Sequence, residues 1–233
     1  MTRQPEVEAV IFDLDGVLVD TEPLWAAVRR ELTLRSGGSW TEEAAAPMLG
    51  MSGPEWSAYM HDSLGVPLAP GEIHERVVAE VVARIGEGLA PIPGASEAVA
   101  RIAERWPIAV ASSADRPVIQ AALSASGLGQ WLRVIVTSED AGRGKPAPDV
   151  FLLAAERLEA APAVTVAVED SANGMRAVKA AGMRLIAIPN PSTHVDQEAL
   201  ALADRVLESI SQLTPEEVTA SMRDDRAGGV TFR

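Results

Sequence analysis

Residues 10–20 read Val10-Ile11-Phe12-Asp13-Leu14-Asp15-Gly16-Val17-Leu18-Val19-Asp20, and the rest of the chain is organised around them. An apolar run ends at Phe12 and is followed by two carboxylates and a glycine, which is typical of a buried parallel strand that ends in a turn. In open α/β sheets, ligands bind at the carboxyl ends of such strands, so Asp13 and Asp15 lie where chemistry would take place. Two carboxylates 4 Å apart repel by about 4 kcal/mol at an effective dielectric constant of about 20. A proton on one of them or a cation between them is therefore expected.

The composition of the chain limits its class of function. The 233 residues carry a net charge of −13, which disfavours nucleic acid or an anionic membrane surface as a partner. The absence of cysteine excludes disulfides and thiolate metal sites, and no apolar run approaches the ~20 residues of a membrane-spanning helix. The first residues lack the apolar segment of a signal peptide, so a cytoplasmic location is expected by default.

Two patterns divide the chain into a core and an insert. Residues 21–88 show helical spacing of apolar residues without a strand signature, and residues 86–94 are rich in glycine and proline, as in a linker. From residue 95 onward, helices alternate with short apolar strands, which predicts a parallel sheet with right-handed crossovers. The expected fold is an α/β, three-layer Rossmann-like core (1–20 and 89–233) with an inserted all-α cap domain (21–88). Strands are predicted at residues 7–12, 108–112, 133–137, 164–168 and 184–188, core helices at 96–105, 116–126, 148–159 and 172–181, and cap helices at 23–32, 41–48, 53–64 and 70–85.

Polar residues follow the second predicted strand and the loop after the third. Ser112 and Ser113 precede a helix, where a hydroxyl and free backbone N–H groups can bind an anion, although an ordinary helix cap fits as well. Lys145 stands before a proline, which restricts its backbone conformation. It is one of two lysines among twenty basic residues, which suggests that a compact point charge is needed here; the alternative is a solvated loop lysine.

A second pair of acids follows the fourth predicted strand. Glu169 and Asp170 suit a hard cation with oxygen ligands such as Mg²⁺, or, taken alone, the positive end of a helix dipole. Because parallel strands end on one edge of a sheet, these acids are expected to converge with Asp13, Asp15, Ser112 and Lys145. Four independent coincidences of this kind are improbable, so the sequence predicts an active site that combines a metal with a phosphate group.

Four stretches of the chain resemble the signature motifs of the haloacid dehalogenase superfamily of phosphohydrolases. Within that superfamily, they are similar to the branch of β-phosphoglucomutase and small sugar-phosphate phosphatases. The resemblance covers nearly the whole chain, including the helical insert directly after the first motif. The matching stretches are Phe12 to Asp20, Ala111-Ser112-Ser113, Gly144-Lys145-Pro146-Ala147-Pro148-Asp149 and Val168-Glu169-Asp170-Ser171-Ala172-Asn173-Gly174.

The resemblance implies catalytic roles for four residues. Asp13 would attack phosphorus in line and form an aspartyl-phosphate. Asp15 would protonate the leaving alcohol and then deprotonate the attacking water. Ser112 and Lys145 would hold the transferring phosphoryl group, which is mostly positioning and charge neutralisation.

The resemblance also implies a cofactor and a substrate site. Mg²⁺ would bind Asp13, the backbone carbonyl of Asp15, and Asp170, with Glu169 either a ligand or the holder of a metal-bound water. The implied substrate is a small phosphorylated metabolite, a sugar or polyol phosphate, and relatives of this size are often monomers. Its binding residues would be Thr21, Glu22, Trp25, Ser112, Ser113, Lys145 and Asn173.

Comparison of the insert with other branches of the family favours a phosphatase. Phosphonate-cleaving relatives need a cap lysine, which this insert lacks, and dehalogenase relatives lack an acid at the position of Asp15. Mutase relatives carry a histidine where Trp25 stands and an arginine that Met51-Ser52-Gly53-Pro54 lacks. Arg76 and Arg84 remain as possible cap cations, so a β-phosphoglucomutase-like phosphoryl transfer stays open. A non-catalytic binding protein is less favoured because no catalytic group is missing.

Overall fold

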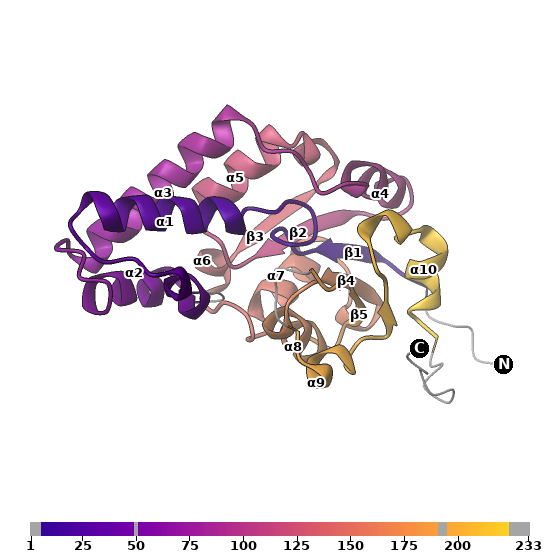
Figure 1. Cartoon of the computed structure of the whole chain (residues 1–233). Coiled ribbons are helices and arrows are strands. Elements are labelled where there is room, and N and C mark those ends of the chain that lie inside the picture. The colour runs from indigo at the N-terminus through magenta and orange to yellow at the C-terminus, as the bar shows by residue number, and fades with distance from the viewer. Residues whose placement is uncertain (1–5, 49–50, 191–194, 224–233) are drawn as a thin grey trace. The chain divides into compact units, whose positions relative to one another are not determined.

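The computed structural model describes residues 6–48, 51–190 and 195–223. Its described backbone divides into two compact units, which we call the sheet unit (residues 6–19, 91–114, 127–190 and 195–223) and the helical unit (residues 20–48, 51–90 and 115–126). Figure 1 traces the chain through both. The helix that follows the second strand thus groups with the inserted helices, whereas the sequence pattern grouped it with the strands.

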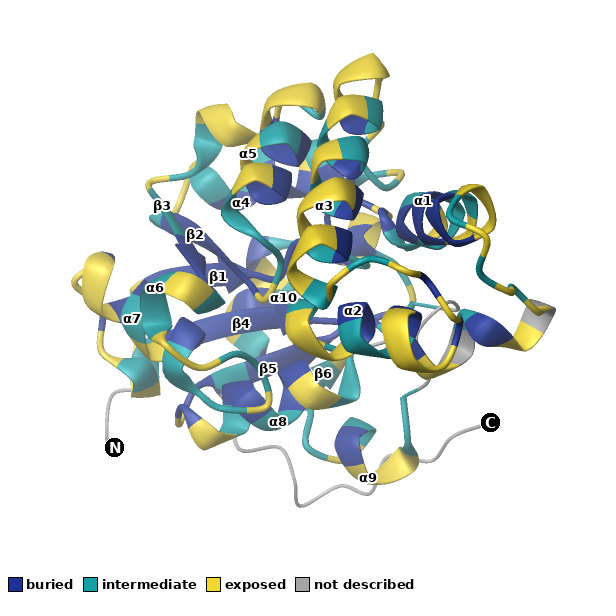
Figure 2. Ribbon diagram, turned by 90° about the vertical axis from the view of Figure 1, so that its left-hand side faces the viewer, coloured by how far each residue is buried: buried dark blue, intermediate teal, exposed yellow. Residues whose placement is uncertain are grey.

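The sheet unit is built on a six-stranded parallel sheet in the order β3-β2-β1-β4-β5-β6, with β1 in an interior position (Figure 2). The first five strands begin and end within two residues of their predicted limits, and the predicted α/β fold class is confirmed. The sixth strand was not predicted, because it has only two residues and is defined by its pairing with β5. The strands are β1 (Ala9–Phe12), β2 (Ile108–Ser112), β3 (Val134–Thr137), β4 (Thr165–Glu169), β5 (Arg184–Ala187) and β6 (Arg205–Val206).

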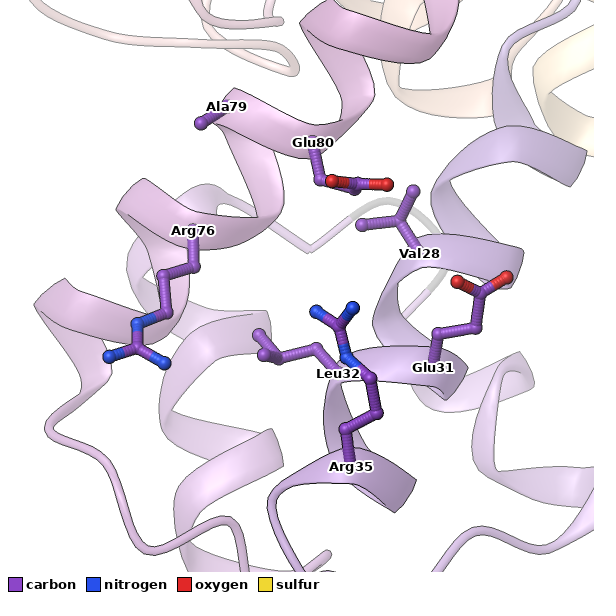
Figure 3. A pocket seen from close by; sticks show the side chains of 7 residues that line it. All are labelled: Val28, Glu31, Leu32, Arg35, Arg76, Ala79 and Glu80. Carbon is purple, nitrogen blue, oxygen red and sulfur yellow. The ribbon is translucent and has the colours of Figure 1, made fainter.

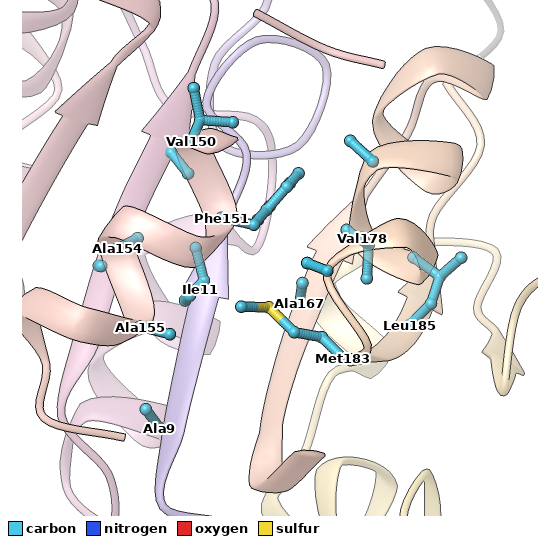
Figure 4. Close-up of a cluster of buried hydrophobic side chains, with 14 of the residues drawn as sticks. Ala9, Ile11, Val150, Phe151, Ala154, Ala155, Ala167, Val178, Met183 and Leu185 are labelled. Carbon is cyan, nitrogen blue, oxygen red and sulfur yellow. The ribbon is translucent and has the colours of Figure 1, made fainter. Parts of the chain in front are cut away.

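In the interior strands, side chains that point to either face of the sheet are buried, so the sequences of these strands are mostly apolar. Every residue of β1, β2 and β4 is buried, as the dark blue strands of Figure 2 show. On one face, α7 (Asp149–Arg157) and α8 (Ala172–Ala180) pack against the strands through a cluster that includes Ile11, Phe151 and Ala167 (Figure 4). This packing fixes the positions of the strand ends, from which the polar residues project.

Seven further elements belong to the described part of the sheet unit. Their limits are α4 (Ala95–Ala103), η3 (Leu128–Trp131), α6 (Ser138–Ala141), η4 (Pro162–Val164), α9 (Gln197–Leu200), η5 (Ile210–Gln212) and α10 (Pro215–Ala220). Beside β5, the buried carboxylate of Asp204 accepts a hydrogen bond from Leu185 N and pairs with Lys179 and Arg184. These contacts join α8, β5 and the segment before β6.

The helical unit consists of α1 (Glu22–Arg35), α2 (Gly53–Asp62), α3 (Pro70–Glu87) and α5 (Arg116–Ala125), with η1 (Glu42–Ala44) and η2 (Ala46–Met48) between the first two. A stripe on α3 is buried, namely Ile73, Val77, Val81 and Ile85, as expected for an amphipathic helix. The predicted helix at residues 41–48 is wrong, because two short 3-10 turns stand in its place and a proline lies in the second. Within the described residues, no helix is long and apolar enough to cross a membrane.

Candidate active site

The candidate site lies in the sheet unit at the carboxyl ends of β1 and β4. These two strands are neighbours, with Phe12 opposite Val168, and the backbone N–H of Asp13 continues the ladder by donating to Val168 O at 2.9 Å. The strand order changes direction between them, because β2 and β3 follow on one side and β5 and β6 on the other. Such a switch point is where open α/β sheets bind their ligands.

A tight turn after β1 fixes the two acids of the first motif. Gly16 has a φ of +82°, a conformation that favours glycine, and its N–H donates to Val19 O at 2.7 Å. Val19 N donates in turn to Leu14 O at 3.1 Å, so the chain doubles back directly after the strand. Asp13 is therefore held on the strand end at 7% exposure, and Asp15 lies in the turn with intermediate exposure.

Lys145 joins the first and last motifs. Its ammonium forms ion pairs with Asp13 Oδ1 and with Glu169 Oε1, the latter at 2.8 Å, and its side chain is only 7% exposed. The same ammonium lies 4.9 Å from the ring centre of Phe151. The backbone N–H of Lys145 donates to Ser113 Oγ at 3.3 Å, which ties its loop to the end of β2. The lysine is thus a buried partner of two carboxylates.

Burial and charge shift the pKa values of this group in ways that depend on one another. Burial raises the pKa of Asp13, the charges of Glu169 and Asp15 act in the same direction, and Lys145 offsets part of the rise. Burial alone would lower the pKa of Lys145, but the charges of Asp13 and Glu169 outweigh it and raise the pKa above its usual value. The lysine therefore stays charged at neutral pH. A further cation near Asp13 would favour its ionised, nucleophilic form.

Three carboxylates form a group that could hold a metal ion. Asp13, Glu169 and Asp170 each place an oxygen within 4.8 Å of the others, and they are 7%, 0% and 1% exposed. An all-oxygen, anionic donor set fits a hard divalent cation and not a soft transition metal. The side chain of Asp15, although described, does not belong to this group.

The remaining predicted residues of the sheet unit lie at or follow the ends of β2 and β4. Ser112 ends β2, opposite Thr137 of β3, and is 2% exposed; its Oγ accepts a hydrogen bond from Ala114 N at 3.1 Å. Ser113 is exposed and contacts the Lys145 loop, as described above. Asn173 is exposed in the first turn of α8. The structure therefore places Ser112 at the same edge of the sheet as Asp13, with Asn173 on the helix that follows β4.

Three predicted substrate residues lie in the helical unit. Thr21 is 1% exposed and occupies the N-cap position of α1 without a side-chain capping bond. Trp25 is 7% exposed and meets Trp56 edge to face, with ring centres 6.0 Å apart. Glu22 lies 3.6 Å from Arg29.

Arg29 was not predicted from the sequence as part of any site. Its guanidinium carbon lies 5.0 Å from the ring centre of Trp25 and 4.9 Å from that of Trp56, and the residue is 6% exposed. Burial lowers the pKa of Arg29, and the charge of Glu22 opposes this shift. The signal available in the sequence was its position four residues after Trp25 and seven after Glu22, on the same helix face. Arg29 therefore belongs to the aromatic core of the helical unit.

The two possible cap cations are paired. Arg76 forms an ion pair with Glu72 at 2.7 Å, and Arg84 binds Glu31 at 2.5 Å and Glu80 at 2.9 Å. A hollow of about 320 Å³ between α1 and α3 is lined by Val28, Glu31, Leu32, Arg35, Arg76, Ala79 and Glu80. Figure 3 shows Arg35 directed into this hollow and Arg76 directed away from it. The hollow contains none of the residues predicted to bind substrate.

Comparisons with known proteins agree with this geometry. A family model of haloacid dehalogenase-like hydrolases matches residues 7–182. Hexitol phosphatase B of Escherichia coli K12 is 31% identical over 224 residues, which cover 94% of this chain and 99% of that protein. A phosphorylated carbohydrates phosphatase of Thermotoga maritima is 33% identical over 181 residues, covering 77% and 84%. The crystal structure of CbbY from Rhodobacter sphaeroides in complex with phosphate matches with a TM-score of 0.81 and 31% identity, covering 91% and 99%.

Proposed function

The chain belongs to the haloacid dehalogenase-like hydrolases, and we propose that it is a Mg²⁺-dependent phosphatase of a small sugar or polyol phosphate. The ester would be hydrolysed in two steps through an aspartyl-phosphate on Asp13. The membership in the family agrees with the resemblance of the four motifs. The metal, the substrate class and the roles of individual residues are the proposal.

The observation that carries the proposal is the charge balance of the buried site. The carboxylates of Asp13, Glu169 and Asp170 each place an oxygen within 4.8 Å of the others, and Lys145 pairs with two of them. Buried carboxylates that lie this close repel one another, which favours a bound cation. A divalent cation with a preference for oxygen ligands balances them, and Mg²⁺ bound there would neutralise charge on a phosphoryl group.

The chain's own residues account for the two chemical steps. In the first, Asp13 attacks phosphorus while the bond to the leaving alcohol breaks, and Asp15 donates a proton to the leaving oxygen. In the second, Asp15 takes a proton from water, which attacks the aspartyl-phosphate and releases phosphate and the free Asp13 carboxylate. Lys145 fixes the orientation of Asp13, and Ser112, whose Oγ is held by the N–H of Ala114, would bind a phosphoryl oxygen.

The substrate class is inferred from the relatives. Two relatives are named for hexitol phosphates and phosphorylated carbohydrates, and a further CbbY structure, 30% identical, contains xylulose 1,5-bisphosphate. A mutase is less well supported, because Trp25 stands where mutase relatives have histidine, and Arg76 and Arg84 are already paired with carboxylates.

The test is phosphate release from p-nitrophenyl phosphate and from a panel of hexitol, hexose, pentulose and nucleoside phosphates, with and without Mg²⁺. We expect release that needs Mg²⁺ and that is abolished in Asp13→Asn, whereas Asp62→Asn, at an exposed aspartate at the end of α2, retains it. Formation of glucose 6-phosphate from β-glucose 1-phosphate would favour the mutase instead. Absence of turnover on all substrates, in protein shown to bind Mg²⁺, would favour a binding protein.

A further inference from the structure

Gly174, in the first turn of α8, lies directly against the carboxylate of Glu169. A Cβ atom at position 174 would fall on Glu169 Oε1 at about the length of a covalent bond, and Cδ and Oε2 of the same carboxylate would also lie well within 3.0 Å of it. Real Cβ atoms essentially never approach another heavy atom within 3.0 Å. Any side chain at this position must therefore displace the Glu169 carboxylate.

The Glu169 carboxylate has no room to move without losing contacts. It is fully buried, Oε1 accepts from Lys145 Nζ at 2.8 Å, and Oε2 accepts from Ser171 N at 2.6 Å and from Ser171 Oγ at 3.0 Å. Ser171 Oγ also accepts the N–H of Gly174 at 3.1 Å, which caps α8. Displacement of the carboxylate by one bond length would break its pairing with the lysine or with the serine.

The backbone does not explain the glycine. Gly174 lies inside a regular helix and is not among the glycines with positive φ, so an alanine would meet no backbone strain. Alanine is also the better helix former. Gly16 differs, because its φ of +82° favours glycine in addition to its close approach to Asp170. A substitution at Gly174 therefore tests the steric role alone, whereas a substitution at Gly16 would also strain the backbone.

We propose that Gly174 is a positioning residue. Because it has no side chain, the Glu169 carboxylate can lie where it pairs with Lys145 and stays close to Asp13 and Asp170. Its expected effect on metal affinity rests on the metal site of the proposed function. Its steric effect on Glu169 does not.

The experiment compares Gly174→Ala with Gly86→Ala. Gly86 lies near the end of α3 and is exposed, and no atom lies within 4 Å of the place that a methyl group would take there, so it reports the helix-propensity effect alone. We expect Gly174→Ala to bind Mg²⁺ about 10–100-fold more weakly by calorimetry, as for changes that displace a group around a metal. We also expect its melting temperature to fall by more than about 4 °C, whereas Gly86→Ala shows no loss in either measurement.

The decisive variant is the double substitution. With Glu169→Ala as background, the methyl group at position 174 has nothing to displace, so the thermal penalty of Gly174→Ala should disappear. Relief in the double variant supports the proposal, even where Gly174→Ala alone does not fold. An undiminished penalty in that background, or a Gly174→Ala protein with wild-type Mg²⁺ affinity and stability, would overturn it. Lack of phosphatase activity in the wild type would remove the proposed function but would leave this thermal comparison valid.

Discussion

Substitution of Lys145 by methionine should abolish catalysis and lower the free energy of unfolding of the sheet unit. Methionine has a similar length, and its sulfur can contact the Phe151 ring where the ammonium now lies, so the change removes the charge with little change in volume. At 2.8 Å, the attraction between Lys145 and Glu169 amounts to about 6 kcal/mol at an effective dielectric constant of about 20. The desolvation of the ammonium offsets part of this, and breaking a buried pair typically costs about 3–5 kcal/mol.

Lys145→Met should lose far more catalytic activity than its loss of folding stability would explain. Removal of one uncharged donor from a reaction centre lowers kcat by about 10²–10³-fold, so we expect a loss of at least ~10³-fold in kcat/KM for the charged group. The assay is phosphate release at saturating Mg²⁺, combined with thermal unfolding. Lys179→Met is the matched control, since Lys179 is the chain's other lysine and pairs with Asp204 at 2.8 Å. If Lys145→Met kept activity within tenfold of Lys179→Met, the assigned role of Lys145 would be refuted.

Three further predictions concern stability. Burial acts to raise the pKa of Asp204, but the contacts with Lys179 and Leu185 N outweigh it and lower the pKa below the unfolded value of 3.8. In urea unfolding at pH 7, Asp204→Asn should therefore have a free energy of unfolding about 3 kcal/mol below that of the wild type. This difference should shrink as the pH falls below about 4, where the unfolded carboxyl binds its proton first. Arg29→Met should change the melting temperature little, because the lost cation–π contacts of about 1–2 kcal/mol are offset by the removal of a buried charge; a loss as large as that of Trp56→Ala would contradict this. Trp25→Ala should lower the melting temperature, because the ring is 7% exposed and packs against Trp56; a loss of kcat/KM for sugar and polyol phosphates but not for acetyl phosphate, at unchanged melting temperature, would contradict this structural role.

The strands could be predicted because each is an apolar run bounded by polar or turn residues. The ends of β2 were predicted to the residue, and those of β5 within one, since burial on both faces leaves a continuous apolar signal. The strand β6 has no such signal, because its two residues become a strand only by pairing with β5. Residues 41–48 show the opposite failure: their alanines favour helix, but Pro47 removes a donor and only short turns form.

For the candidate site, the sequence predicted which strand ends carry the functional residues, but not the contacts between their side chains. Parallel strands bring their ends to one edge, which was enough to expect Asp13 and Glu169 near each other. The direct pairing of Lys145 with both carboxylates depends on the path of its loop and on packing against Phe151, which no local pattern encodes. The same holds for Arg29, whose aromatic partners come from two different helices.

Trapping of the phosphorylated enzyme tests whether Asp13 is the nucleophile. The protein is mixed with p-nitrophenyl phosphate and Mg²⁺, quenched with acid during turnover, and analysed by mass spectrometry of the intact chain and of its peptides. We expect an added mass of one phosphoryl group, on the peptide that contains Asp13, labile in base and absent from Asp13→Asn. Turnover without any trapped phosphoryl group under single-turnover sampling, or a phosphoryl group on another residue, would contradict the mechanism.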